Sequence, residues 1–140
     1  MKKVNFLVAL ALVNLVSFSA LAEDEKVLLA KEYIELSKTK EIFDSTIEAY
    51  VTQISQQNPK VNKDELRKIF NSYMGWEVLK DPSIEIVSRM FTVKELQDAN
   101  TFYRSASGKA IAEKSPQMSA ELANLVANNF NKAIEHMQTQ

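Results

Sequence analysis

Residues 91–109 read FTVKELQDANTFYRSASGK, and this stretch contains the start signals of two consecutive helices. Thr92 precedes Glu95 by three residues, which is the spacing of a capping box: the hydroxyl accepts the third helical amide and the carboxylate bonds back to the cap amide. Ser105 can cap a second helix in the same way. Apolar residues follow the first cap at helical spacing: Leu96, Ala99 and Tyr103. The stretch therefore predicts two helices that meet near Ser105.

The sequence on both sides of this stretch also has the period of a helix. One apolar stripe runs through residues 40–56 at Phe43, Ile47, Tyr50 and Ile54. Another occupies the last 22 or so residues at Met118, Leu122, Leu125, Val126, Phe130, Ile134 and Met137. We expect helices to bury such stripes against one another. No segment shows the strict alternation of a β-strand.

Turn-forming residues are scarce. The 140 residues include two Gly and three Pro, against about ten and seven in an average chain of this length. A β-sandwich or barrel needs more turn-forming residues than this sequence contains. Helix boundaries are expected at Asn58-Pro59, Asp81-Pro82 and Ser115-Pro116, and further caps at Thr39 and Asn62. These signals predict an all-α fold, an irregular bundle of about six to seven helices after an N-terminal signal peptide.

The first 22 residues have the pattern of a secretory signal. Lys2 and Lys3 precede an apolar region from Val4 to Val16, and Ala20-Leu21-Ala22 forms a small-x-small cleavage site. Residues 1–22 are therefore predicted to be removed, which leaves residues 23–140 as one helical domain. We expect this domain to be periplasmic in a diderm bacterium and secreted otherwise. No later stretch of the sequence is apolar enough to span a membrane.

Charge and cysteine content narrow the possible functions. Of 17 basic residues, two lie in the predicted signal, so the mature domain has 15 basic and 18 acidic residues, a formal charge of −3. This balance does not favour binding to nucleic acid. Because the chain contains no Cys, it has no disulfide, no thiolate nucleophile and no cysteine-ligated metal.

The sequence contains no convincing set of catalytic residues. His136 is the only imidazole, and Glu135-His136 lacks the spacing of a di-iron ligand pair, so we expect His136 at the surface or near a helix end. A Ser–Lys site at Ser105, Ser107 and Lys109 lacks the Gly-rich context of a phosphate loop. A cap at Ser105, a close helix contact at Gly108 and a solvated Lys109 are favoured instead. We therefore expect neither enzymatic activity nor a metal or cofactor.

Residues 73–129 resemble the DUF2059 family of exported, all-helical bacterial proteins of unknown function. The family pattern is F-T-x-x-E-L followed by F-Y-x-S-P-x-G-K. The residues that match it are Phe91, Thr92, Glu95, Leu96, Phe102, Tyr103, Ser105, Gly108 and Lys109. Ala106 stands where the family has Pro. The resemblance implies a fold and an export route but no activity. The motif itself is interpreted as two caps, a core aromatic pair and a close-packing Gly.

Two functional hypotheses follow. The first is a non-enzymatic interaction or accessory protein that binds an unidentified protein partner, with Trp76 as an aromatic residue expected to be partly exposed. The alternative is a carrier of a small molecule or lipid. Its cavity would lie among the helices and would be lined by Met74, Met90, Phe91, Phe102, Tyr103 and Phe130. The sequence leaves the oligomeric state open.

Overall fold

The computed structural model describes residues 23–138, so the predicted signal peptide lies outside the described residues. Residues 23–36 are helical. Five further helices follow: α2 (Thr39–Gln57), α3 (Lys63–Met74), α4 (Trp76–Met90), α5 (Val93–Arg104) and α6 (Ala106–Gln138). The described residues contain no strand. The predicted all-α fold is confirmed.

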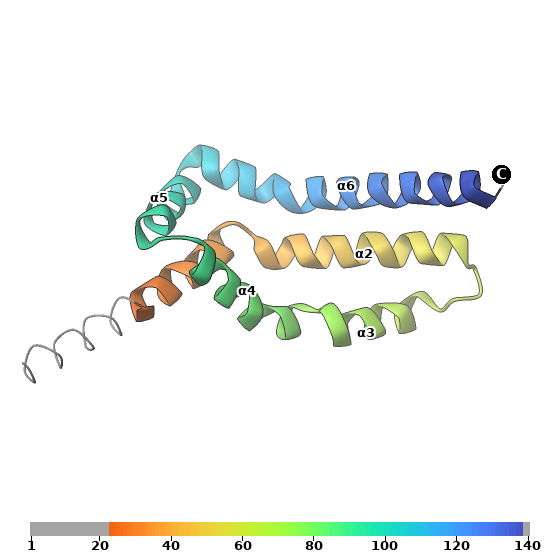
Figure 1. The fold of residues 1–140 in the computed structure, drawn as a ribbon, viewed down its shortest axis with the longest axis horizontal. Coiled ribbons are helices and arrows are strands. Elements are labelled where there is room, and N and C mark those ends of the chain that lie inside the picture. The colour runs from red at the N-terminus through yellow and green to blue at the C-terminus, as the bar shows by residue number, and fades with distance from the viewer. Residues whose placement is uncertain (1–22, 139–140) are drawn as a thin grey trace, which may run out of the picture.

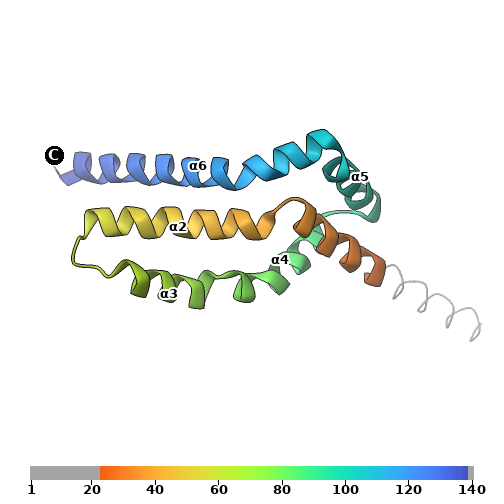
Figure 2. The same cartoon turned by 180° about the vertical axis from the view of Figure 1, so that it is seen from behind.

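Helices α2, α3 and α6 lie side by side in an open layer (Figures 1 and 2). Helix α2 occupies the middle, with α6 parallel to it on one side and α3 antiparallel on the other. The segment 23–36, α4 and α5 gather at one end of this layer. One apolar core cluster is located there: Ala30, Ile34, Ile84 and Leu96 are buried against one another. Ile47 and Val51 are buried farther along α2.

Small side chains of α6 face α2. Ala120 lines a groove with Ala49 of α2, and Ala127 lines another with Tyr50 and Ile54 of α2. Ala123, which lies between them on α6, is buried. Small residues let two helix backbones approach closely. Most of the large apolar residues of α6 remain exposed beside this contact.

Single residues make two of the helix junctions. Gly75 is both the C-cap of α3 and the N-cap of α4. Ser105 ends α5, and its Oγ accepts a hydrogen bond from the Gly108 amide at 3.1 Å, in the first turn of α6. The capping box is also present: the Glu95 amide donates to Thr92 Oγ1 at 3.2 Å, and the Thr92 amide donates to the Glu95 carboxylate at 2.7 Å.

Removal of the Ser105 hydroxyl is expected to lower the free energy of unfolding by about 1 kcal/mol, the usual effect of losing a helix N-cap. The variant is Ser105→Ala, measured by urea unfolding. Ser107→Ala, at an exposed position two residues later, is the control and should leave the stability unchanged. An equal loss in both variants would contradict the capping role.

Three predicted boundaries are wrong. Pro82 lies inside α4 and Pro116 inside α6, and α2 is preceded by Lys38 at φ 61° instead of being capped by Thr39. A proline removes one helical hydrogen bond, but a continuous α4 lets Trp76 and Ile84 pack into the same core. Helix α6 changes direction in its first half (Figure 1), as expected of a helix that contains proline. The two predicted C-terminal helices are therefore one continuous helix, α6.

The prediction that the C-terminal apolar stripe is buried is also wrong. Six of its seven residues are more than half exposed: Met118, Leu122, Leu125, Val126, Phe130 and Met137. Phe102 was expected in the core, yet it is 45% exposed, because α5 turns Leu96 and Asn100 inward. No helix of the described region is long and apolar enough to cross a membrane.

Candidate functional site

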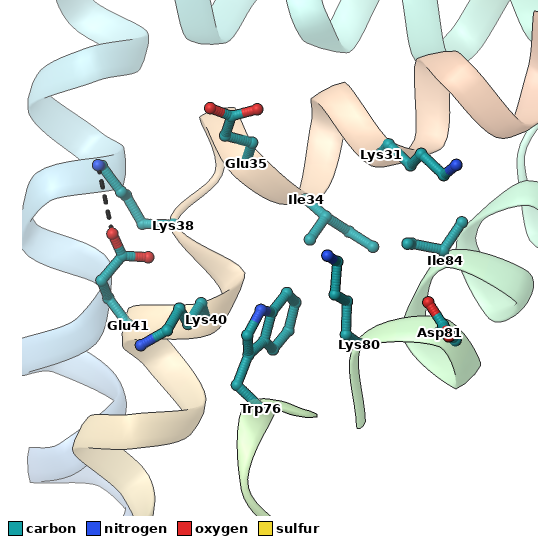
Figure 3. Close-up of a pocket in the computed structure, with 10 residues that line it drawn as sticks. All are labelled: Lys31, Ile34, Glu35, Lys38, Lys40, Glu41, Trp76, Lys80, Asp81 and Ile84. Carbon is teal, nitrogen blue, oxygen red and sulfur yellow. Dashed lines mark ion pairs between the residues drawn. The ribbon is translucent and has the colours of Figure 1, made fainter. Parts of the chain in front are cut away.

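A pocket of about 550 Å³ opens beside Trp76, where residues 23–36, the start of α2 and the start of α4 meet (Figure 3). Its residues are Lys31, Ile34, Glu35, Lys38, Lys40, Glu41, Trp76, Lys80, Asp81 and Ile84. Cavities of this size accommodate small organic molecules. The pocket is therefore one candidate binding site.

The inner part of the pocket is apolar. Trp76 is partly buried, and its ring lies 6.3 Å from that of Phe43, centroid to centroid. Ile34 and Ile84 are buried and point toward Trp76 (Figure 3). Trp76 thus has the partial exposure expected from the sequence, and its indole offers a flat surface to a ligand.

The rim of the pocket is charged with both signs. Lys38 pairs with Glu41 at 3.3 Å, and Lys40 pairs with Asp44 at 2.5 Å. The hydrogen bond to Asp44 raises the pKa of Lys40. Among the described residues, Lys31 and Lys80 form no ion pair and remain available to a ligand acid group. The arrangement suits binding of a molecule that combines a flat apolar part with an acid group, since the indole offers a flat surface and the lysines offer positive charge.

The predicted carrier cavity does not exist as proposed. The six expected lining residues do not enclose a common space, and five of them are exposed: Met74, Met90, Phe91, Phe102 and Phe130. The rings of Phe91 and Tyr103 instead pack on Tyr33, with centroids 5.9 and 5.8 Å away. Tyr103 lines a separate cavity of about 300 Å³ together with Lys109. Helical periodicity placed these apolar residues on common helix faces. It could not indicate which of those faces the tertiary fold leaves exposed.

The residues of the family motif have mainly structural contacts. Leu96 is 1% exposed in the core, and Gly108 is buried against the end of α5. The backbone hydrogen bond from Thr92 lowers the pKa of Glu95. The Ser105 hydroxyl accepts a hydrogen bond from the Gly108 amide in its cap, and the contact between Ser105 and Lys109 is made by backbone: the Lys109 amide donates to the Ser105 carbonyl at 3.0 Å. His136 lies exposed in the last turn of α6.

The sequence did not predict a polar cluster formed by Asn100, Glu32 and Arg104. Asn100 is 1% exposed, and its Nδ2 donates to the Leu29 carbonyl at 3.1 Å and to the Glu32 carboxylate at 3.2 Å. Arg104 donates to the same carboxylate. The cluster fixes α5 against the segment 23–36. Asn100 follows Leu96 by four residues, so a polar side chain on the buried face of a helix was the available signal.

A second candidate site is the exposed apolar surface of α6. We call it the α6 stripe and define it as Ile111, Met118, Leu122, Leu125, Val126, Phe130 and Met137, each at least 50% exposed. At 100° per residue these side chains lie within roughly 140° of the helix circumference. A groove between α2 and α6 borders the stripe, with Tyr50 and Ile54 on its α2 side.

The other side of the helical layer is charged. Glu48 of α2 forms a bidentate pair with Arg67 of α3 at 2.8 and 3.0 Å and also contacts Lys63 at 3.0 Å. Glu48 lines a groove with Asp44 and Asn124. The layer therefore has a polar side and an apolar side, and the apolar side includes the α6 stripe. Among the described residues, no group of three or more His, Cys, Asp or Glu side chains forms a metal site.

Acid is expected to weaken the contact between α2 and α3. Hydrogen bonds from Arg67, and then from Lys63, lower the pKa of Glu48 from 4.5 to about 2. A carboxylate with a lowered folded-state pKa stabilises the fold above its unfolded pKa, and this contribution is lost as the pH falls from about 4.5 towards 2. Glu48→Gln should flatten the pH dependence of the free energy of unfolding in this window. Glu85→Gln should not, because Glu85 is exposed and forms no ion pair with any other described residue. Because the side chains of Glu48 and Arg67 are about 40% exposed, added salt should reduce the difference between the two variants. Identical pH profiles for Glu48→Gln and Glu85→Gln would contradict the stabilising role of Glu48.

Comparison with curated proteins and with solved structures finds no match. The comparison with family models finds one. The matched segment, residues 77–135, covers α4, α5 and most of α6 and so includes the core residues Ile84 and Leu96 and the α6 stripe up to Phe130. These residues match the model of DUF2059, described as an uncharacterized protein conserved in bacteria, which confirms the resemblance predicted from the two motifs.

Proposed function

We propose that this chain is an exported protein that acts by binding another protein, without catalysis, and that the α6 stripe is its binding surface. The observation that carries the proposal is the exposure of the stripe. Seven large apolar side chains on one helix are each at least half exposed. Contiguous exposed apolar surface of this kind typically marks an interaction site in a water-soluble domain.

The chemistry of the remaining residues supports binding over catalysis. The Ser105 hydroxyl is engaged in a helix cap, and the Glu95 carboxylate is engaged in the capping box. A nucleophile needs an adjacent base to be activated. The hydroxyl beside Glu95 is that of Thr92, which donates to the Glu95 carboxylate at 2.8 Å and accepts from the Glu95 amide, so both groups are used by the cap. The signal-like residues 1–22 support export. Mass spectrometry of the protein recovered outside the cytoplasm should find Glu23 at the N-terminus, and an intact Met1 terminus would contradict processing.

Site-specific photocrosslinking in cells tests the binding surface. A photoreactive residue placed at Val126, on the stripe, is expected to yield a discrete crosslinked product. The same residue at Asn128 is the control, since Asn128 is exposed on the same helix but lies outside the stripe. No product at Val126, or equal products at both positions, would contradict the proposal.

The pocket beside Trp76 favours a second function, the binding of a small organic anion. Three features of the pocket support this function. The indole of Trp76 forms one wall, Lys31 and Lys80 offer positive charge, and the volume is about 550 Å³. Trp76 is the only tryptophan of the chain, so its fluorescence reports directly on the pocket. Anilinonaphthalene sulfonate is a suitable probe because it is a flat aromatic anion.

We expect the probe to quench Trp76 and to bind less tightly to Lys80→Glu. Lys132→Glu, which changes an exposed lysine of α6 far along the chain from the pocket residues, is the matched control and should bind like the wild type. Quenching that is unchanged in Lys80→Glu would indicate that the probe binds elsewhere, for instance on the α6 stripe.

A further inference from the structure

The α6 stripe exposes enough surface to form half of a stable interface. Its seven side chains are 50–65% exposed. With ~200 Å² for a large apolar side chain, the stripe presents roughly 800 Å² of apolar surface. One partner of a standard protein–protein interface contributes about 800 Å². A single partner of ordinary size can therefore cover the stripe.

The same side of the molecule carries both a ridge and a groove. The ridge consists of the exposed side chains of α6. The groove, of about 280 Å³, runs between α2 and α6 and is lined by Tyr50 and Ile54 on one side and by Val126 and Phe130 on the other. In a two-fold symmetric interface the same patch meets itself, so each ridge can enter the groove of the other copy. The surface thus has the self-complementary form that such an interface requires.

Charge also favours a second copy as the occupant. Residues 115–131 contain a single charged residue, Glu121. The stripe therefore does not repel its own copy, and it has no charge pattern that would select an oppositely charged protein. A membrane surface is disfavoured, because interfacial helices carry many basic residues beside the apolar face, whereas the lysines of α6 are matched in number by its glutamates.

From area, shape and charge we infer that a second copy of this chain covers the α6 stripe, so that the protein is a two-fold symmetric dimer joined through α6. This inference rests on the proposed function, since it names the partner of the same surface. Dimerisation buries the apolar side of both helical layers and leaves the charged side, with Glu48 and Arg67, in solvent.

Sedimentation velocity over a hundredfold range of concentration tests the inference with the purified mature protein, residues 23–140. We expect the wild type to have twice the mass of the chain. Leu122→Glu should raise the dissociation constant by more than about tenfold, because each dimer would bury two unpaired carboxylates. Asn128→Glu adds the same charge at an exposed position about 120° away around α6 and should remain dimeric. Leu122 is 53% exposed in one copy, so both variants should fold, which circular dichroism verifies.

The remaining outcomes overturn the inference in distinguishable ways. A monomeric wild type at all concentrations excludes the second copy; if Val126 still crosslinks to a different protein, the proposed function stands. A dimer that Leu122→Glu leaves intact places the interface elsewhere on the molecule. A monomeric chain that binds vesicles of anionic phospholipid through the stripe identifies a lipid surface as the occupant.

Discussion

Gly108→Ala is expected to destabilise the protein, although the same substitution in an ordinary helix stabilises it by about 1 kcal/mol. A Cβ atom at Gly108 would lie 2.0 Å from the carbonyl oxygen of Phe102 and 2.6 Å from the Cα of Tyr103. Both contacts are to backbone, so rotation of a side chain cannot relieve them. The turn at Ser105 would have to open, and α5 would shift relative to α6.

We expect Gly108→Ala to lower the free energy of unfolding by about 1–3 kcal/mol, the usual range for overpacking, and Gly108→Leu to lower it further or prevent folding. Urea unfolding followed by circular dichroism measures the change. Ala110→Leu is the matched control: it adds a larger side chain to α6 at an exposed position and should change stability by less than about 0.5 kcal/mol. A Gly108→Ala variant more stable than the wild type would contradict the close approach of α5 and α6.

Leu96→Ala is expected to have the other large effect, a loss of about 2–5 kcal/mol in the free energy of unfolding. Leu96 is 1% exposed and packs with Ala30, Ile34 and Ile84. It therefore joins α5 to α4 and to the segment 23–36. Because the core of this chain is small, truncation leaves a cavity that few neighbouring side chains can fill.

This loss is a large fraction of the 5–15 kcal/mol by which domains are usually stable. Leu28→Ala removes the same atoms at a position that is 65% exposed and should cost less than about 1 kcal/mol. Thermal unfolding of the two variants provides the comparison. Equal midpoints would show that Leu96 is not a central core residue.

Local sequence signals correctly predicted the helix caps at Thr92 and Ser105, but they wrongly predicted helix boundaries at Pro82 and Pro116. The reason is physical. A cap at Thr92 or Ser105 depends on atoms within three residues, so the sequence contains all the information that it needs. Whether Pro82 ends a helix depends on what the helix gains by continuing, and that gain arises from distant residues. In this chain, Trp76 and Ile84 reach one core only because α4 continues through Pro82.

The candidate site also has one feature that the sequence predicted and others that depend on the tertiary fold. The sequence identified Trp76 as an aromatic residue of partial exposure, because it follows Gly75 near a helix end. It could not locate the pocket, since Lys31 and Lys80 lie far apart in the chain and meet only in the fold. Similarly, periodicity placed most residues of the α6 stripe on one apolar face. It could not show that alanines of α6, and not this face, would pack against α2.

By itself, then, the sequence determined the helical fold, the caps at Thr92, Ser105 and Asn62, and the similarity to DUF2059, because periodicity and capping are properties of neighbouring residues. The tertiary structure alone decided which apolar side chains are buried. Leu96 became core and Leu122 became surface, although both belong to regular apolar stripes. Burial depends on which helices pack together, and in this open three-helix layer one face of α6 has no neighbour among the described residues of the chain.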